Sequence, residues 1–204
     1  MLDFLVAGGP FMVLLVLTSV VALAFIIERG FALRWRRVIP GPLSAAVETT
    51  YTTGDAEPLK QACQAHPSPL SRLLLLAAEH LAWTKPENQD ALQTQARHEV
   101  LKLERGLVVL EVIVGISPLL GLVGTIHGLI TLFGDIGRAG LGDSSVVARG
   151  IGIALNTTLA GLLIAVPSLV AWSYFTKKVE VLTAEMELIC DEFLRFHYRR
   201  RKKA

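Results

Sequence analysis

The sequence RGIGIALNTTLAGLLIAVP occupies residues 149–167, and the chain carries no charged side chain from Gly150 to Phe175. At about 1.5 Å per residue, a helix of this length exceeds the roughly 30 Å hydrocarbon core of a bilayer. The run therefore predicts a transmembrane helix over residues 147–175.

Polar residues interrupt this apolar run near its middle, at Asn156, Thr157 and Thr158. Lipid offers no hydrogen-bond partner at that depth, so such groups are expected to face protein or water. One interpretation is a polar lining for an ion pathway. The other is plain helix packing, with the threonine hydroxyls bonded to carbonyls one turn earlier. The residues leave both open.

Small residues recur every three or four positions along the same helix and so share one face, which lets a second helix approach closely. A similar set lies in SPLLGLVGTIHG, residues 117–128, where Pro118 removes one backbone hydrogen bond. The residues predicted to pack helices together are Gly121, Gly124, Gly128, Gly150, Ala154, Gly161 and Ala165.

Two further apolar runs, at 4–27 and 107–134, complete three predicted membrane-spanning helices. The glycine-rich segment 135–146 is too short to join anything but antiparallel neighbours. Residues 28–106 form a water-soluble stretch in which we expect three or four helices, and residues 176–204 form a basic C-terminal helix and tail. The sequence thus predicts an all-α integral membrane protein whose long second and third helices extend into a helical cytoplasmic domain.

No strong helix breaker separates Asn88 from the second predicted span, so one continuous helix is expected there. Within that span His127 is the one ionisable side chain near membrane depth. It is a candidate ion-pathway residue, and a neutral ring packed between helices is an equal alternative.

Basic residues mark one side of the predicted spans, which by the positive-inside rule lies in the cytoplasm. The N-terminus and the segment 135–146 are then outside. The basic residues are also placed to contact membrane lipids, whereas a net charge of +2 indicates no nucleic-acid partner. They are Arg29, Arg34, Arg36, Arg37 and the tail 199–203.

Catalytic spacings are absent from the sequence: no nucleophile, base or metal-ligand cluster is present. The sequence therefore predicts neither an enzyme nor a cofactor or metal site. Cys63 and Cys190 are interpreted as packing residues, because thiols stay reduced in the cytoplasm and their spacing fits no metal motif.

The second and third predicted spans resemble the three-span subunits of the ExbB/TolQ/MotA inner-membrane ion-channel superfamily. Residues 117–128 are similar to the family's second-span pattern Pro-x-x-Gly-Leu-x-Gly-Thr-x-x-Gly, and residues 147–167 are similar without gaps to its third-span pattern ending in Ala-x-Pro. The lack of a fourth span and of a large cytoplasmic domain favours the ExbB/TolQ branch over flagellar stators.

This resemblance implies a pentamer in the bacterial inner membrane, enclosing a dimer of a single-span ExbD/TolR/MotB-like partner. In the family an aspartate in the partner's membrane helix carries the ion, and threonines of the second and third spans line its route. By position those are Thr125 and Thr158. Ion flow would then power envelope work such as TonB-dependent transport or Tol-type processes, with H⁺ or Na⁺ transported and no cofactor needed. The alternative is a structural scaffold or secretion-channel component that uses the same spans only to assemble.

Two features depart from the family pattern. ExbB- and TolQ-like proteins carry a glutamate five residues before the third-span threonine, and here that position is Ile153. Proton-type members commonly have Ala-Thr where this chain has Thr157-Thr158, which resembles the sodium-driven stators. Oxygen ligands suit a hard cation such as sodium, so proton and sodium both stay open.

Overall fold

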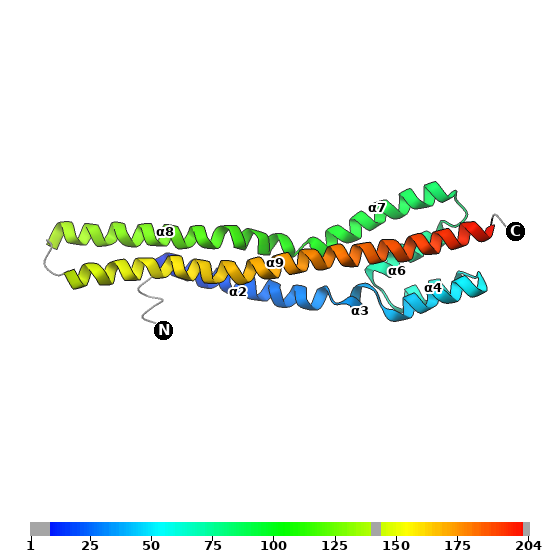
Figure 1. The fold of residues 1–204 in the computed structure, drawn as a ribbon, viewed down its shortest axis with the longest axis horizontal. Helices are drawn as coiled ribbons and strands as arrows, with labels where there is room; N and C mark the ends of the chain where they lie inside the picture. The colour runs from blue at the N-terminus through cyan, green and yellow to red at the C-terminus, as the bar shows by residue number, and fades with distance from the viewer. Residues whose placement is uncertain (1–8, 140–143, 202–204) are drawn as a thin grey trace. The chain divides into compact units, whose positions relative to one another are not determined.

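A computed structural model describes residues 9–139 and 144–201, in which every regular element is a helix (Figure 1). Three of the helices are long and apolar enough to cross a membrane: α2 (Gly9–Ala32), α8 (Leu107–Ala139) and α9 (Ser144–Arg201). The predicted all-α fold with three candidate spans is confirmed, and α9 continues far beyond its apolar part.

The described residues form two compact units. The membrane unit contains residues 9–29 and 106–174, and the head unit contains residues 30–105 and 175–201. Helices α2 and α9 each contribute residues to both units.

Within the membrane unit, α8 and α9 pack as an antiparallel pair with their backbones close together. A Cβ atom on Gly121 would lie 2.8 Å from the carbonyl oxygen of Thr157 and 3.0 Å from the Cα of Thr158. A Cβ on Gly128 would lie 3.0 Å from the Cβ of Ala154. Higher-numbered residues of α8 thus meet lower-numbered residues of α9, and the glycines make this close approach possible.

The same pattern continues toward both ends of the pair. A Cβ on Gly161 would lie 2.5 Å from the carbonyl oxygen of Ser117. A Cβ on Gly150 would lie 2.6 Å from the side chain of Leu132. Ala165 is buried farther along α9. Six of the residues expected to pack helices together thus lie at the α8–α9 contact, namely Gly121, Gly124, Gly128, Gly150, Ala154 and Gly161.

Helix α2 runs antiparallel to α8. Near its start, Phe11 lies 3.2 Å from where Gly124 would carry a Cβ. Near its other end, the Arg29 guanidinium Nε lies 2.5 Å from the corresponding position at Gly106. The three long helices of the membrane unit therefore alternate in direction, as three consecutive membrane crossings require.

The helix expected to run unbroken from Asn88 into the second span is divided. Helix α7 (Lys85–Glu104) ends before Arg105 and Gly106, and α8 begins at Leu107. Glycine is a poor helix former, and the side chain of Arg29 occupies the space beside Gly106. The end of α7 and the start of α8 thus coincide with a contact between Arg29 and Gly106.

Helix α8 also continues past residue 134 to Ala139. Since α9 begins at Ser144, helical residues occupy much of the segment 135–146 that was expected to be a loop. Residues 140–143 lie outside the described residues, as do residues 4–8 of the first predicted span.

The head unit is a bundle of short helices around the second half of α9. Its helices are α3 (Trp35–Val38), α4 (Gly41–Thr53), α5 (Glu57–Ala65), α6 (Pro69–Glu79) and α7. Prolines open four of them, and α4 ends at Gly54, whose φ of +76° is the left-handed conformation that favours glycine at a helix C-terminus. The α9 side chains buried here recur at helical spacing and include Val179, Leu182, Met186, Cys190 and Phe193.

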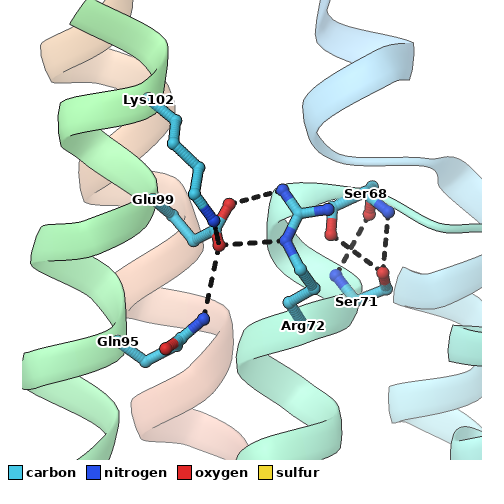
Figure 2. Close-up of polar contacts among 6 residues, drawn as sticks. All are labelled: Ser68, Ser71, Arg72, Gln95, Glu99 and Lys102. Atoms are coloured by element: carbon cyan, nitrogen blue, oxygen red, sulfur yellow. Dashed lines mark hydrogen bonds and ion pairs between the residues drawn. The ribbon is translucent and has the colours of Figure 1, made fainter.

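Figure 2 shows a buried carboxylate that ties α7 to α6 within the head unit. Glu99 is fully buried and accepts hydrogen bonds from both Nε and a terminal nitrogen of Arg72, the former at 2.9 Å. Lys102 donates to the same carboxylate at 2.9 Å. Burial on its own raises the pKa of Glu99, but the hydrogen bonds and charges of these two cations outweigh it and lower the pKa. The carboxylate therefore stays ionised in the interior.

Candidate functional site

Three threonine hydroxyls meet where α8 and α9 are closest. Thr125 comes from α8, and Thr157 and Thr158 come from α9. The Thr125 Oγ1 lies 3.4 Å from the Thr157 Oγ1 and is in hydrogen-bond contact with the Thr158 Oγ1. Thr125 and Thr157 are buried, whereas Thr158 is half-buried. Thr158 is therefore the most accessible of the three.

Two backbone carbonyls complete this group, which we call the threonine cluster. The Gly121 oxygen lies 3.1 Å from the Thr125 hydroxyl and 3.2 Å from the hydroxyls of Thr157 and Thr158. The Ala154 oxygen lies 3.1 Å from the Thr125 hydroxyl and 2.7 Å from the Thr157 hydroxyl. The cluster thus contains three hydroxyl oxygens and two carbonyl oxygens drawn from both helices.

The chemistry of the threonine cluster is that of an acceptor-rich site. Each hydroxyl has one proton to donate, and a carbonyl has none. The three hydroxyl protons are too few to form a hydrogen bond at every close oxygen–oxygen contact in the cluster. Some oxygen lone pairs therefore accept no hydrogen bond within it. Such oxygen atoms can accept a hydrogen bond from a proton donor, and they are the ligands that hard cations prefer.

The glycines on α8 are what allow the cluster to form. Gly121 lets the α9 backbone approach its carbonyl, and a Cβ on Gly124 would lie 2.9 Å from the Thr157 hydroxyl. Close packing of the two helices and their polar hydroxyl groups thus occur at the same place. Intrahelical bonds from Thr125 and Thr157 are present, as the packing interpretation expects, but each hydroxyl also bonds to the opposite helix.

Asn156 lies outside the threonine cluster. It is half-buried, and none of the hydrogen bonds found among the described residues joins it to the cluster. Successive residues of a helix are rotated by about 100°, so the polar triplet does not face one direction. The sequence could not show which of its members turn toward α8.

His127 also lies outside the cluster, on the side of α8 that faces α2. Its exposed ring packs edge-on against the ring of Phe11, with centroids 5.5 Å apart. It lines a cavity of about 290 Å³ that also reaches Thr157. His127 is therefore near the threonine cluster without belonging to it.

The same cavity brings in Asp135, a residue that the sequence interpretation left in a loop. Because α8 continues to Ala139, His127, Thr131 and Asp135 fall at intervals of four on one helix and share a face. This spacing was visible in the sequence, but the glycines at 137, 140 and 142 favoured a loop. The cavity is completed on α9 by Ile153 and Ala154, among others.

Metal-ligating side chains do not gather in the part of the chain that the structure describes. It contains no group of three or more histidine, cysteine, aspartate or glutamate side chains placed to hold a metal ion. Cys63 and Cys190 are buried free thiols in the head unit.

Comparisons with known proteins identify relatives of this chain. The MotA/TolQ/ExbB proton channel family matches residues 66–188, more than half of the chain, including both helices of the threonine cluster. The ExbB-like 1 biopolymer transport protein of Synechocystis sp. is 34% identical over 210 residues, covering 94% of this chain and 80% of that protein. The ExbB-like 3 protein of the same organism is 30% identical over 200 residues, covering 94% of each. Biopolymer transport protein ExbB of Neisseria meningitidis is 27% identical over 192 residues, covering 88% and 87%.

Proposed function

This chain belongs to the MotA/TolQ/ExbB proton channel family, and from that premise we propose that a transported cation passes along its threonine cluster. The family is one of channels and transport proteins, and this supports an ExbB-type channel subunit as the function. The observation that carries the proposal is the acceptor-rich cluster of Thr125, Thr157 and Thr158 between two candidate spans.

The proposed assembly is a pentamer in the bacterial inner membrane around a dimer of a single-span, aspartate-bearing partner. Large apolar side chains remain exposed along the candidate spans, which supports burial against lipid or other helices. Thr158 is the cluster residue that we place nearest the partner's aspartate, because it is the least buried of the three. The N-terminus is proposed to lie outside and the C-terminus in the cytoplasm.

The proposed energy source is a proton- or sodium-motive force. One elementary charge crossing 100 mV releases about 2.3 kcal/mol, so several ions can drive a mechanical step. The work is proposed to take place in the cell envelope, as in TonB-dependent transport or Tol-type processes. Hydroxyl and carbonyl oxygens suit either a proton donor or sodium.

A pair of substitutions at Thr158 tests this function. Thr158→Val removes the hydroxyl while nearly conserving the shape of the side chain, whereas Thr158→Ser keeps the hydroxyl. We expect valine to abolish ion flux through proteoliposomes containing the chain and its partner, and serine to retain most of it. Native mass spectrometry of the same samples should show the mass of a pentamer of 22.2 kDa chains with a partner dimer in all cases.

If the chain is instead a structural scaffold, the same experiment is expected to give a different result. If Thr158→Val assembles normally and passes ions as well as the wild type, the threonine cluster only packs helices. A pentamer that never retains a partner would also favour the scaffold, and a monomer would exclude both assemblies.

A further inference from the structure

The cavity beside the threonine cluster is lined by several polar side chains of α8. Asp135, Thr131 and His127 are exposed and line its α8 side, while the buried Thr157 lines it at the cluster. Thr157 belongs to both the cavity and the cluster. The lining of one cavity therefore includes both an exposed carboxylate and a hydroxyl of the threonine cluster.

Asp135 supplies negative charge to this cavity. Of the ionisable side chains described in the membrane unit, His127 and Asp135 line it, whereas Arg149 is exposed on α9 outside the lining. Among the side chains that the structure describes, which do not include that of Arg138, no cation is paired with the Asp135 carboxylate. A carboxylate that lines a cavity raises the local concentration of cations, because low-dielectric walls focus its field.

The opposite wall of the cavity has no charge. It contains the apolar side chain of Ile153. Ile153 and Asp135 line the same cavity from different helices. A carboxylate is thus present in the cavity although α9 does not provide it.

We propose that this cavity is the outer vestibule through which a monovalent cation reaches the threonine cluster, and that Asp135 is the residue that attracts the cation. The ligand is a hydrated monovalent cation, either hydronium or sodium. This inference rests on the proposed function, since it supplies the entrance to the same pathway. His127 and Thr131 form the wall along which the cation moves to Thr157.

Charge-selective labelling of an introduced thiol tests the vestibule without measuring ion flux. Thr131→Cys places a thiol on its wall, and intact cells are then treated with membrane-impermeant methanethiosulfonate reagents of matched size, one cationic and one anionic. We expect the cationic reagent to react faster. Adding Asp135→Asn should reduce the ratio of the two rates by about threefold or more, as expected for removing a nearby charge under partial screening.

The chain provides matched controls for this measurement. Glu111→Gln removes one exposed carboxylate from the same helix but outside the cavity, and should leave the ratio unchanged. Cys63 and Cys190 are buried, and burial raises the pKa of the Cys63 thiol to about 11, so the wild-type background should be low.

Two outcomes would overturn the vestibule: no reaction of the Thr131→Cys thiol from outside the cell, or a rate ratio that Asp135→Asn leaves unchanged. The Thr158→Val result is independent of both. If Thr158→Val abolishes flux while Asp135→Asn leaves flux and labelling untouched, the channel stands and the vestibule fails. If labelling behaves as expected while Thr158→Val passes ions normally, the proposed ion route fails and the cavity is only a cation-attracting pocket.

Discussion

Arg72 and Glu99 are held together by an asymmetric ion pair. The Glu99 side chain is fully buried, whereas 45% of the Arg72 side chain is exposed. Water can therefore solvate the arginine if its partner is lost, but it cannot reach the carboxylate. The two possible ways of breaking the pair are expected to have different costs.

We expect Arg72→Gln to destabilise the protein more than Glu99→Gln does. Glu99→Gln removes charge-assisted hydrogen bonds and should cost about 2 kcal/mol. Arg72→Gln leaves a buried carboxylate with Lys102 as its remaining cation, which is the costlier state. Thermal unfolding of both variants in the same detergent, followed by tryptophan fluorescence, measures the order. The reverse order would mean that Glu99 has access to water.

The same carboxylate predicts a pH dependence of stability. The folded-state pKa of Glu99 lies below its ordinary value of 4.5, so its contribution is fully present above about that pH. The contribution is lost as the pH falls through the lower, folded-state pKa, since protonation is then easier in the unfolded chain. Glu99→Gln should flatten this part of the acid limb of a melting-temperature profile.

At the level of the helices, the α8–α9 contact depends on glycines at particular positions. A Cβ on Gly121 would lie 2.8 Å from a backbone oxygen of α9, an atom that cannot move aside alone. Gly115 lies on the same helix, and nothing lies within 4 Å of the position of its Cβ. These two glycines therefore form a matched pair for substitution.

Gly121→Ala is expected to separate the two helices and to destabilise the membrane unit, because the added methyl group has no space. Gly115→Ala is expected to be neutral or to stabilise α8 by up to about 1 kcal/mol, since alanine is the better helix former. Unfolding in increasing sodium dodecyl sulfate compares the two. Equal stability of both variants would show that α8 and α9 do not approach as closely as described.

The sequence predicted the candidate spans because long apolar runs are a local property of the chain. It did not predict the break before Leu107, since the contact of Arg29 with Gly106 joins residues far apart in sequence. Nor did it predict that α8 continues to Asp135, because glycines there are typical of loops. Helix ends that depend on tertiary packing leave little trace in local composition.

The candidate site was foreseen in part for the same reason. Thr125 and Thr158 were placed together by the resemblance, and Thr157 by its polarity within an apolar run. The carbonyl oxygens of Gly121 and Ala154 were not foreseen, because every residue has a carbonyl and only the helix geometry selects these two. The role of Asp135 required the α8 extension and the cavity together.

At the scale of the whole molecule, the vestibule is formed by two helices, and a carboxylate on either of them would line it. Ile153 on α9 and Asp135 on α8 line the same space, and Ile153 is half-buried. Low-dielectric walls focus the field of any charge that lines the cavity. A carboxylate at position 153 would therefore also attract cations into the cavity.

Ile153→Glu should therefore restore function to a chain that carries Asp135→Asn. We expect Asp135→Asn to slow cation flux in the assembled complex, and the added glutamate to recover a large part of the loss. Ile153→Gln is the control, because it adds a polar group of the same size without charge and should recover nothing. Flux in proteoliposomes under a proton or a sodium gradient measures the recovery for each ion. Equal behaviour of the glutamate and glutamine variants would mean that the cavity responds to polarity alone, and that Asp135 attracts no cation there.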